Sequence, residues 1–392
     1  MSPKSLASLV LLCTPRLVAP LHLGRRAVMC GLAAAVLPSS TARSSDARPA
    51  GAPPEGPTGL LEGAQTYYVN APRQLVVVAD TAREASLLSA EFVICGEHHN
   101  SPSDHQLEAS LLLGMADAAA RDGVPLILGL EMFERAFQPA LDAYCAGSLS
   151  DTELYSATEW ATRWVWPWDQ YLPIFQLARE RGVKLVALNT DTEVLRRVPV
   201  EGLGSLSVDQ RADLVPDPQG FITATRDPFF GRYTNAIIMA SYDVHVLNRF
   251  MDARATEAGF FSARILRDEA MASRTVQAAG ERGRALILAG ADHVKFEYGL
   301  DRRLRRYAAR SGRANARVET ILLNASPEDT LSASVNSLAL SLGPEDNAPR
   351  LASYLIYSAS GSRAARRDDA WSKLHLQRED QIIRTREKLR IQ

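Results

Sequence analysis

The chain has 392 residues, of which 46% are hydrophobic and 23% charged, as is typical of a globular protein with a substantial core. Its formal net charge is -1, and residues 46–392 carry 39 basic and 45 acidic side chains, a net charge of -6. This mildly acidic balance argues against nucleic acid as a partner, because binding to phosphates needs a basic surface.

The first 45 residues differ in composition from the rest of the chain. They contain five basic residues and no acidic one, and they are rich in Ser, Ala and Leu, which is typical of an organelle transit peptide. Arg25 and Arg26 precede an apolar run of 11 residues, Ala27–Leu37, which suits a signal peptide and is too short to span a bilayer. We therefore expect a targeting leader over residues 1–45 that directs the chain to the chloroplast and, through the twin arginines, to the thylakoid lumen.

Two other interpretations of this leader remain open. It can be a stromal transit peptide in which the arginine pair has no role, or a bacterial twin-arginine export signal. Residues 46–70 are predicted to be a flexible linker, residues 71–360 one α/β domain, and residues 361–392 a charged helical tail. No transmembrane span is expected in the mature chain.

Short apolar runs alternate with helical patterns along the body of the chain. Buried strands are predicted over residues 92–96, 125–130, 183–188, 285–289, 318–323 and 354–357. Helical patterns cover residues 107–115, 136–144, 151–182, 235–258, 268–279 and 300–310, and the Pro- and Gly-rich residues 198–232 predict an irregular excursion. This alternation predicts a three-layer α/β fold with a mostly parallel central sheet and helices on both faces.

Polar residues follow four of the predicted strands. The segments are Gly96-Glu97-His98-His99, Glu131-Met132-Phe133, Asn189-Thr190-Asp191 and Gly290-Ala291-Asp292-His293. Because parallel strands end at one edge of a sheet, where ligands bind, we expect Glu97, His99, Glu131 and His293 to face one cavity. These four residues can act as paired acids and bases, and Glu97, His99 and His293 can bind a divalent metal.

Several neighbouring residues have a structural interpretation beside a functional one. His98 is expected to point away from the cavity, His105 to satisfy its loop or reach the rim, and His245 to be structural. Asp268 is placed in the first turn of a helix, where it suits the helix dipole, and Arg267 can pair with a carboxylate or an anionic ligand. The tryptophans can line an apolar pocket or belong to the core, at Trp160, Trp164, Trp166 and Trp168.

The cysteines indicate neither a disulfide framework nor covalent haem attachment. Two of the four lie in the leader, no C-x-x-C motif occurs, and Cys95 and Cys145 are expected to be buried as apolar residues.

The order and spacing of these segments resemble the ChaN-like haem-binding family of the Tiki superfamily, over residues 85–330. The matching segments are Gly96–His99, Glu131–Phe133, Trp168 with Tyr171–Ile174, Ala187–Asn189, Arg267–Ala272 and Leu288–His293. The resemblance implies an erythromycin-esterase-like α/β fold and a role in haem or iron handling. It also implies that haem or a related tetrapyrrole is held by a tyrosine within a homodimer, with Tyr171 and Tyr144 as candidates. The expected cofactor-binding residues are Tyr171, Asn189, Arg267 and Asp268.

The same superfamily contains proposed metal-dependent proteases and relatives of erythromycin esterases. In those proteins the two G-x-x-H histidines and a strand-end glutamate are the proposed catalytic groups, which correspond to His99, His293 and Glu131. A metal-dependent hydrolase is therefore the alternative function, and a scaffold with purely structural polar residues is a third. The second histidine of Gly96–His99, the excursion at 198–232 and the leader depart from the family pattern.

Overall fold

The computed structural model describes residues 64–70, 74–78, 81–247, 251–330, 332 and 337–358, all of which belong to one compact unit. The predicted leader over residues 1–45 and the predicted tail over residues 361–392 lie outside the described residues. Among the described helices, none combines the length and apolar composition that a membrane span requires.

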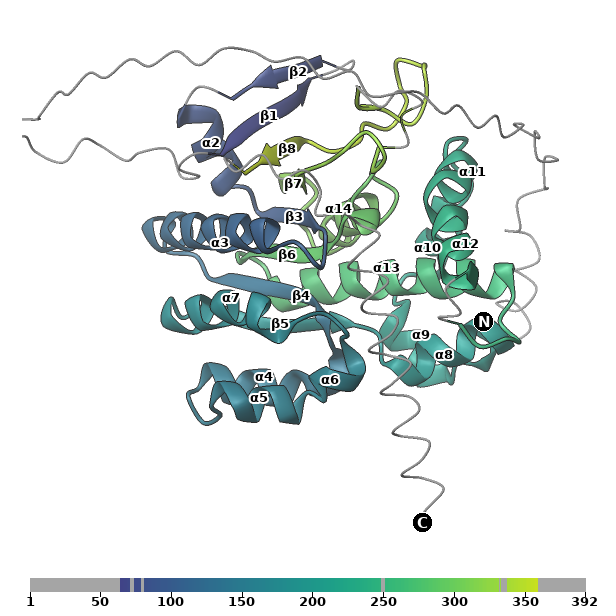
Figure 1. The fold of residues 1–392 in the computed structure, drawn as a ribbon, viewed down its shortest axis with the longest axis horizontal. Helices are drawn as coiled ribbons and strands as arrows, with labels where there is room; N and C mark the ends of the chain where they lie inside the picture. The colour runs from purple at the N-terminus through teal and green to yellow at the C-terminus, as the bar shows by residue number, and fades with distance from the viewer. Residues whose placement is uncertain are drawn as a thin grey trace, which may run out of the picture. The chain divides into compact units, whose positions relative to one another are not determined.

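An eight-stranded sheet runs through this unit in the order β2-β1-β8-β7-β3-β6-β4-β5 (Figure 1). The six strands from β8 to β5 are parallel, and β1 pairs antiparallel with both β8 and β2. The prediction of a mostly parallel sheet is therefore confirmed. The strands are β1 Gln65–Asn70, β2 Gln74–Val77, β3 Phe92–Glu97, β4 Leu126–Glu134, β5 Lys184–Asn189, β6 Arg284–Gly290, β7 Val318–Leu323 and β8 Tyr354–Tyr357.

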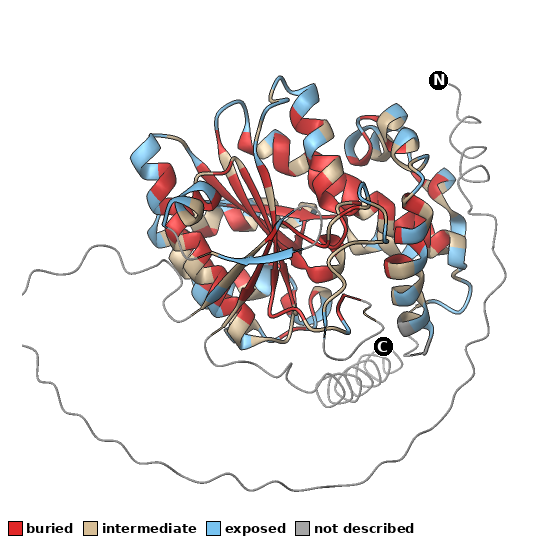
Figure 2. Ribbon diagram, turned by 90° about the horizontal axis from the view of Figure 1, so that it is seen from above, coloured by how far each residue is buried: buried red, intermediate tan, exposed pale blue. Residues whose placement is uncertain are grey.

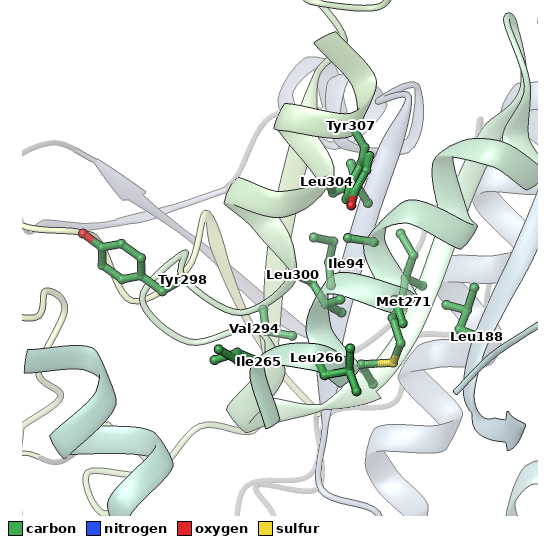
Figure 3. Close-up of a cluster of buried hydrophobic side chains, with 14 of the residues drawn as sticks. Ile94, Leu188, Ile265, Leu266, Met271, Val294, Tyr298, Leu300, Leu304 and Tyr307 are labelled. Atoms are coloured by element: carbon green, nitrogen blue, oxygen red, sulfur yellow. The ribbon is translucent and has the colours of Figure 1, made fainter. Parts of the chain in front are cut away.

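Helices cover both faces of the sheet, as the alternating pattern predicts. Helices α3 (Pro102–Asp122) and α7 (Trp168–Glu180) pack with Val93 and Cys95 in one core, while α13 (Glu257–Ala279) and α14 (Leu300–Arg310) pack with the alternate β3 residues in the other. Buried residues line the central strands in Figure 2, and Figure 3 shows side chains of α13 and α14 gathered beside Ile94 and Leu188. The near-continuous burial of β3 and β4 explains why these strands are apolar without alternation.

The first two strands correct the predicted linker. Residues 65–70, the last six of that linker, form β1, which pairs with β8 and carries Tyr67, Tyr68 and Val69, residues favoured in strands. Strand β2 was also missed. Of the two cysteines, Cys95 is buried and Cys145 is only partly buried, and both are free.

The predicted irregular excursion at 198–232 is also wrong, because much of it is helical. Local caps explain the short helices: Ser207 and Gln210 form a capping box, and the Asp217 side chain accepts the Gly220 N–H. The elements are α8 Thr192–Glu201, η2 Leu203–Ser205, α9 Val208–Leu214, α10 Pro218–Ala224, α11 Phe230–Tyr233, the π-helix η3 Thr234–Met239 and α12 Ala240–Leu247. These helices gather beside one end of α13 (Figure 1).

Two long predicted helices are divided in the structure. The pattern over residues 151–182 becomes three helices, because Glu159 has a left-handed φ of 50° and Pro167 precedes α7. In the region 235–258, α12 is described as far as Leu247, and α13 starts later with Thr256 as its N-cap. The remaining elements are α2 Thr81–Leu88, η1 Arg135–Phe137, α4 Gln138–Cys145, α5 Asp151–Ala157, α6 Trp160–Arg163 and η4 Ala291–His293.

Candidate functional site

The candidate site lies where the sheet changes its direction of winding. The chain leaves β3 toward α3 on one face, and it leaves β6 toward α14 on the opposite face, although β3 and β6 are neighbours. Glu97 at the end of β3 pairs in register with Gly290 at the end of β6. In α/β sheets, the carboxyl edge at such a switch point is where ligands bind.

Glu97 holds the ring of His99 at this edge. Oε1 of Glu97 is 2.5 Å from His99 Nδ1 and accepts the Tyr171 hydroxyl at 2.7 Å. Its other oxygen, Oε2, lies 3.5 Å from His105 Nε2. Burial raises the pKa of Glu97, but His105 and His99 outweigh it and hold that pKa well below its usual range, so this carboxylate is ionised at neutral pH.

His99 presents its second ring nitrogen at the sheet edge. Its side chain is 21% exposed, and its ring packs against Trp164 and Trp166 with centroid distances of 4.9 and 5.4 Å. A neutral ring that donates its Nδ1 proton to Glu97 keeps a lone pair on Nε2. Burial lowers the pKa of His99, but Glu97 outweighs burial, so the net shift is upward from 6.5.

His293 lies between two carboxylates. Nδ1 of His293 contacts Asp268 Oδ1, and its Nε2 is 3.2 Å from Glu131 Oε1. All three side chains are almost fully buried. Burial raises the pKa of both acids, but His293 and nearby arginines outweigh it and lower both pKa values. Both ring nitrogens of His293 therefore lie against carboxylate oxygens.

Arg267 and Asn189 complete this second group. Arg267 Nη2 is 2.6 Å from Glu131 Oε1, and its Nε donates to Asn189 Oδ1 at 2.8 Å. Asp268 does not lie in the first turn of its helix as predicted, because α13 begins at Glu257. Its ionised state is therefore stabilised by His293 rather than by a helix dipole.

Gly290 brings the two groups together. Its N–H donates to Glu131 Oε2 at 2.6 Å, and a Cβ added at this glycine would lie 2.8 Å from His99 Nε2 and 3.7 Å from Glu131 Oε2. The structure thus places Glu97, His99, Glu131 and His293 at one edge, as the sequence predicts. Their chemical roles stay predictions.

The three predicted metal ligands, Glu97, His99 and His293, do not converge on one point. Both nitrogens of His293 face carboxylates, whereas Glu97 lies beside His105 and Glu108. Within the described part of the chain, Glu97, His105 and Glu108 form the group whose ligand atoms lie within 4.8 Å of one another. Sequence reasoning missed Glu108, although an acidic residue on the apolar stripe of α3, three residues after His105, was a usable signal.

The two candidate tyrosines are both fully buried. Tyr171 donates to Glu97, and Tyr144 donates to Asp151 Oδ1 at 2.8 Å. Burial, together with these neighbouring carboxylates, raises the pKa of both phenols. In this arrangement Tyr171 positions Glu97, and neither phenol offers an exposed oxygen to an iron ion.

Three further side chains lie as the sequence suggests. His98 turns away from the edge, with Nδ1 2.8 Å from Asp104 and Nε2 3.1 Å from Asp329. Burial lowers the pKa of His98, but Asp104 and Asp329 outweigh it and raise that pKa to about 9. His245 donates from Nδ1 to the Ser241 carbonyl, and Trp160 belongs to the core.

Comparison with known proteins gives a family and one chloroplast relative. A family model described as haem-binding uptake, Tiki superfamily, ChaN matches residues 84–304. The chain is 28% identical over 216 residues to Protein RETICULATA-RELATED 5, chloroplastic, of Arabidopsis thaliana. The match covers 54% of this chain and 28% of the relative, so the chain spans just over a quarter of that protein's length.

Two solved structures are similar in fold. One shows cofacial haem binding to ChaN of Campylobacter jejuni, with 14% identity, a TM-score of 0.46 and coverage of 74% of this chain and 96% of that chain. The other is an erythromycin esterase mutant in its open conformation, with 14% identity, a TM-score of 0.37 and coverage of 76% and 97%.

Proposed function

Because the chain belongs to the ChaN family of haem-binding uptake proteins in the Tiki superfamily, we propose that it binds haem or a related tetrapyrrole at the carboxyl edge between β3 and β6 and acts in haem or iron handling. The main support for placing the ligand at this edge is the position of the His99 ring. Its Nδ1 is held by Glu97, its ring packs against two tryptophans, and its Nε2 faces Gly290 at the end of β6.

The donor set of this edge fits haem. A carboxylate on the far nitrogen of a ligating histidine fixes its tautomer and raises its basicity, which is the role that Glu97 has for His99. Trp164 and Trp166, each 9% exposed, pack beside the His99 ring and could give apolar contacts to a porphyrin. Haem bound there would supply an iron centre whose reactivity depends on its axial ligand.

The other predicted cofactor-binding residues take different roles in this proposal. Arg267 is 21% exposed and can contact the acidic substituents of a tetrapyrrole, while Asn189 orients its guanidinium. Asp268 orients His293 from within α13, and Tyr171 orients Glu97. The proposed axial donor is therefore His99 in place of the tyrosine that the family resemblance implies.

Titration of the purified full chain with haemin tests the proposal. The wild-type protein is expected to shift and sharpen the Soret band to a saturating stoichiometry. His99→Ala should abolish that shift, whereas Tyr171→Phe and Tyr144→Phe should retain it. Absence of a shift in the wild type, or a shift that persists in His99→Ala and disappears in a tyrosine variant, would contradict it.

A homodimer that encloses the cofactor belongs to the same proposal. Sedimentation of the chain with and without haemin measures it, and a monomer in both conditions would oppose it.

We propose first that the protein is located in the chloroplast, and second that it resides in the thylakoid lumen. The acid-free, arginine-containing leader and the chloroplastic relative support the first statement, and Arg25-Arg26 supports the second. Import into isolated chloroplasts, followed by protease treatment of the thylakoids, tests both. Arg25→Lys with Arg26→Lys should leave the chain in the stroma, and unchanged protection of this variant would remove the lumenal assignment.

Hydrolysis is a second candidate function, favoured by the two histidine–carboxylate pairs at one edge. His99 Nε2 is placed to take a proton from water, and Glu97 orients the ring. Arg267 could stabilise an oxyanion beside Glu131. Assays on ester and peptide panels, with and without added divalent metal, should show activity that His99→Ala removes. Activity that survives His99→Ala, or none on any substrate, would count against this function.

A further inference from the structure

A group of buried titratable side chains lies on the α3 side of the His99 site. It comprises Glu97 from β3 with His105 and Glu108 from α3, which are 2%, 3% and 0% exposed. One ligand atom from each lies within 4.8 Å of the others. The haem-binding proposal uses only the Oε1 atom of Glu97, so the remaining atoms of this group have no role in it.

Most of these atoms have no hydrogen-bond partner. Glu97 Oε2, both ring nitrogens of His105 and both carboxylate oxygens of Glu108 are buried without one. Buried polar atoms in folded proteins are nearly always paired, and an unpaired buried charge is strongly destabilising. One ligand atom from each of the three side chains borders the same buried space, and this arrangement fits an electropositive group held between them.

In the part of the chain that the structure describes, the neighbouring residues do not supply that group. His105 Nε2 is 3.5 Å from Glu97 Oε2, too long for a hydrogen bond, and the His105 ring packs on Tyr171 with a centroid distance of 4.2 Å. The Tyr171 hydroxyl donates to the opposite oxygen of Glu97. Two carboxylates thus share a buried position with one imidazole.

We propose that Glu97, His105 and Glu108 bind one divalent cation. One imidazole nitrogen and two carboxylate oxygens suit Zn²⁺, Mn²⁺ or Fe²⁺ better than Ca²⁺, which takes six to eight oxygen ligands. This site differs from the predicted ligand set of Glu97, His99 and His293, because it uses neither of the latter two. It is also independent of bound haem.

The cation has a structural consequence for the neighbouring site. Glu97 would bind it through Oε2 while Oε1 holds His99 and Tyr171, so one carboxylate joins the two sites. Because His105 and Glu108 belong to α3 and Glu97 ends β3, the cation also ties the helix to the strand. Binding of a ligand to the folded state alone stabilises that state.

Elemental analysis of the haem-free full chain, followed by titration with Zn²⁺, Mn²⁺ and Mg²⁺, tests the proposal. After chelation and dialysis, the wild type is expected to bind one equivalent of Zn²⁺ or Mn²⁺ with a rise in Tm. Glu108→Gln and His105→Asn should each weaken cation binding by at least about tenfold. Removal of a residue that only supports a metal ligand already lowers metal affinity by about 10–100-fold. The exposed Glu180 supplies a matched control, and Glu180→Gln should bind like the wild type.

Other outcomes would overturn the proposal. A wild type that binds no cation and shows no Tm change would mean that a proton shared by Glu97 and Glu108 explains the cluster. Binding lost in His293→Asn but kept in His105→Asn would place the cation on the other ligand set. The wild-type Tm with and without chelator decides the question even where a variant does not fold.

Discussion

Each of the two site histidines is oriented by a carboxylate that contacts its Nδ1 atom. Glu97 fixes Nδ1 of His99, and Asp268 does the same for His293. The sequence places Glu97 two residues from His99, so that pair was within reach of prediction. Asp268 is 25 residues before His293 on another element, and no local pattern in the chain indicates their contact.

Gly290→Ala tests the close approach of His99 to β6. The backbone of Gly290 has a φ of -57°, which alanine adopts freely, but the added Cβ would lie 2.8 Å from His99 Nε2. We expect the ring to be displaced and the Kd for haemin to rise by about tenfold, equivalent to about 1.4 kcal/mol. Haemin titration measures this change. A variant that binds haemin as the wild type does would show that Nε2 is not the contact.

Asp301 gives the protein a pH dependence that is separate from the site. It lies on α14 at 3% exposure, where burial outweighs Arg305 and raises its pKa from 3.8 to about 6. An acid whose pKa is raised on folding stabilises the fold below its unfolded pKa and loses that contribution as pH rises through the folded value. The contribution of Asp301 to the free energy of unfolding should therefore fall between about pH 4 and 6.

Asp301→Asn removes this titration. Relative to the wild type, the variant should gain up to about 3 kcal/mol between those pH values, at about 1.4 kcal/mol per pKa unit. Urea unfolding at a series of pH values measures the difference. Parallel profiles for the two proteins would show that Asp301 titrates normally.

At the scale of elements, α13 is positioned by close contact with α8. A Cβ added to Gly259 would lie 2.0 Å from the Pro199 carbonyl oxygen, which already accepts the Thr256 N–H at 3.0 Å. Only a residue without a side chain permits this approach of two backbones. The contact fixes the helix that carries Arg267 and Asp268.

Gly259→Ala should therefore lower the free energy of unfolding by about 1–3 kcal/mol, the usual cost of overpacking. Gly231 is the matched control, because it is also helical and its added Cβ meets nothing within 4 Å. Gly231→Ala should be neutral or stabilising by about 0.5–1 kcal/mol. Urea unfolding measures both, and equal effects of the two substitutions would refute the importance of the close contact.

The sequence predicts elements with a strong apolar pattern, but it does not predict elements that form only by pairing with a distant part of the chain. Strands such as Phe92–Glu97 are continuous apolar runs that any burial argument finds. In contrast, β1 is stabilised by pairing with β8, which lies almost 300 residues later in the chain. The breaks at Glu159 and just before α13 depend on local backbone geometry that helical periodicity does not report.

For the whole molecule, the sheet order explains both the success and the limit of the site prediction. Polar residues at the ends of β3, β4 and β6 could be predicted to meet because parallel strands share an edge. Asp268 could not be placed, since the rotation of a helix over a sheet depends on packing of the entire core, whereas Glu108 had a signal in its position on the apolar stripe of α3. The same limit applies to Tyr171, whose burial no motif indicates.

A crystal structure of the full chain with bound haemin tests the central claim most directly. We expect the iron at the carboxyl edge between β3 and β6, bound by His99 Nε2, with the porphyrin against Trp164 and Trp166. Haemin bound through a tyrosine or on another face of the molecule, with His99 still directed at Gly290, would contradict it.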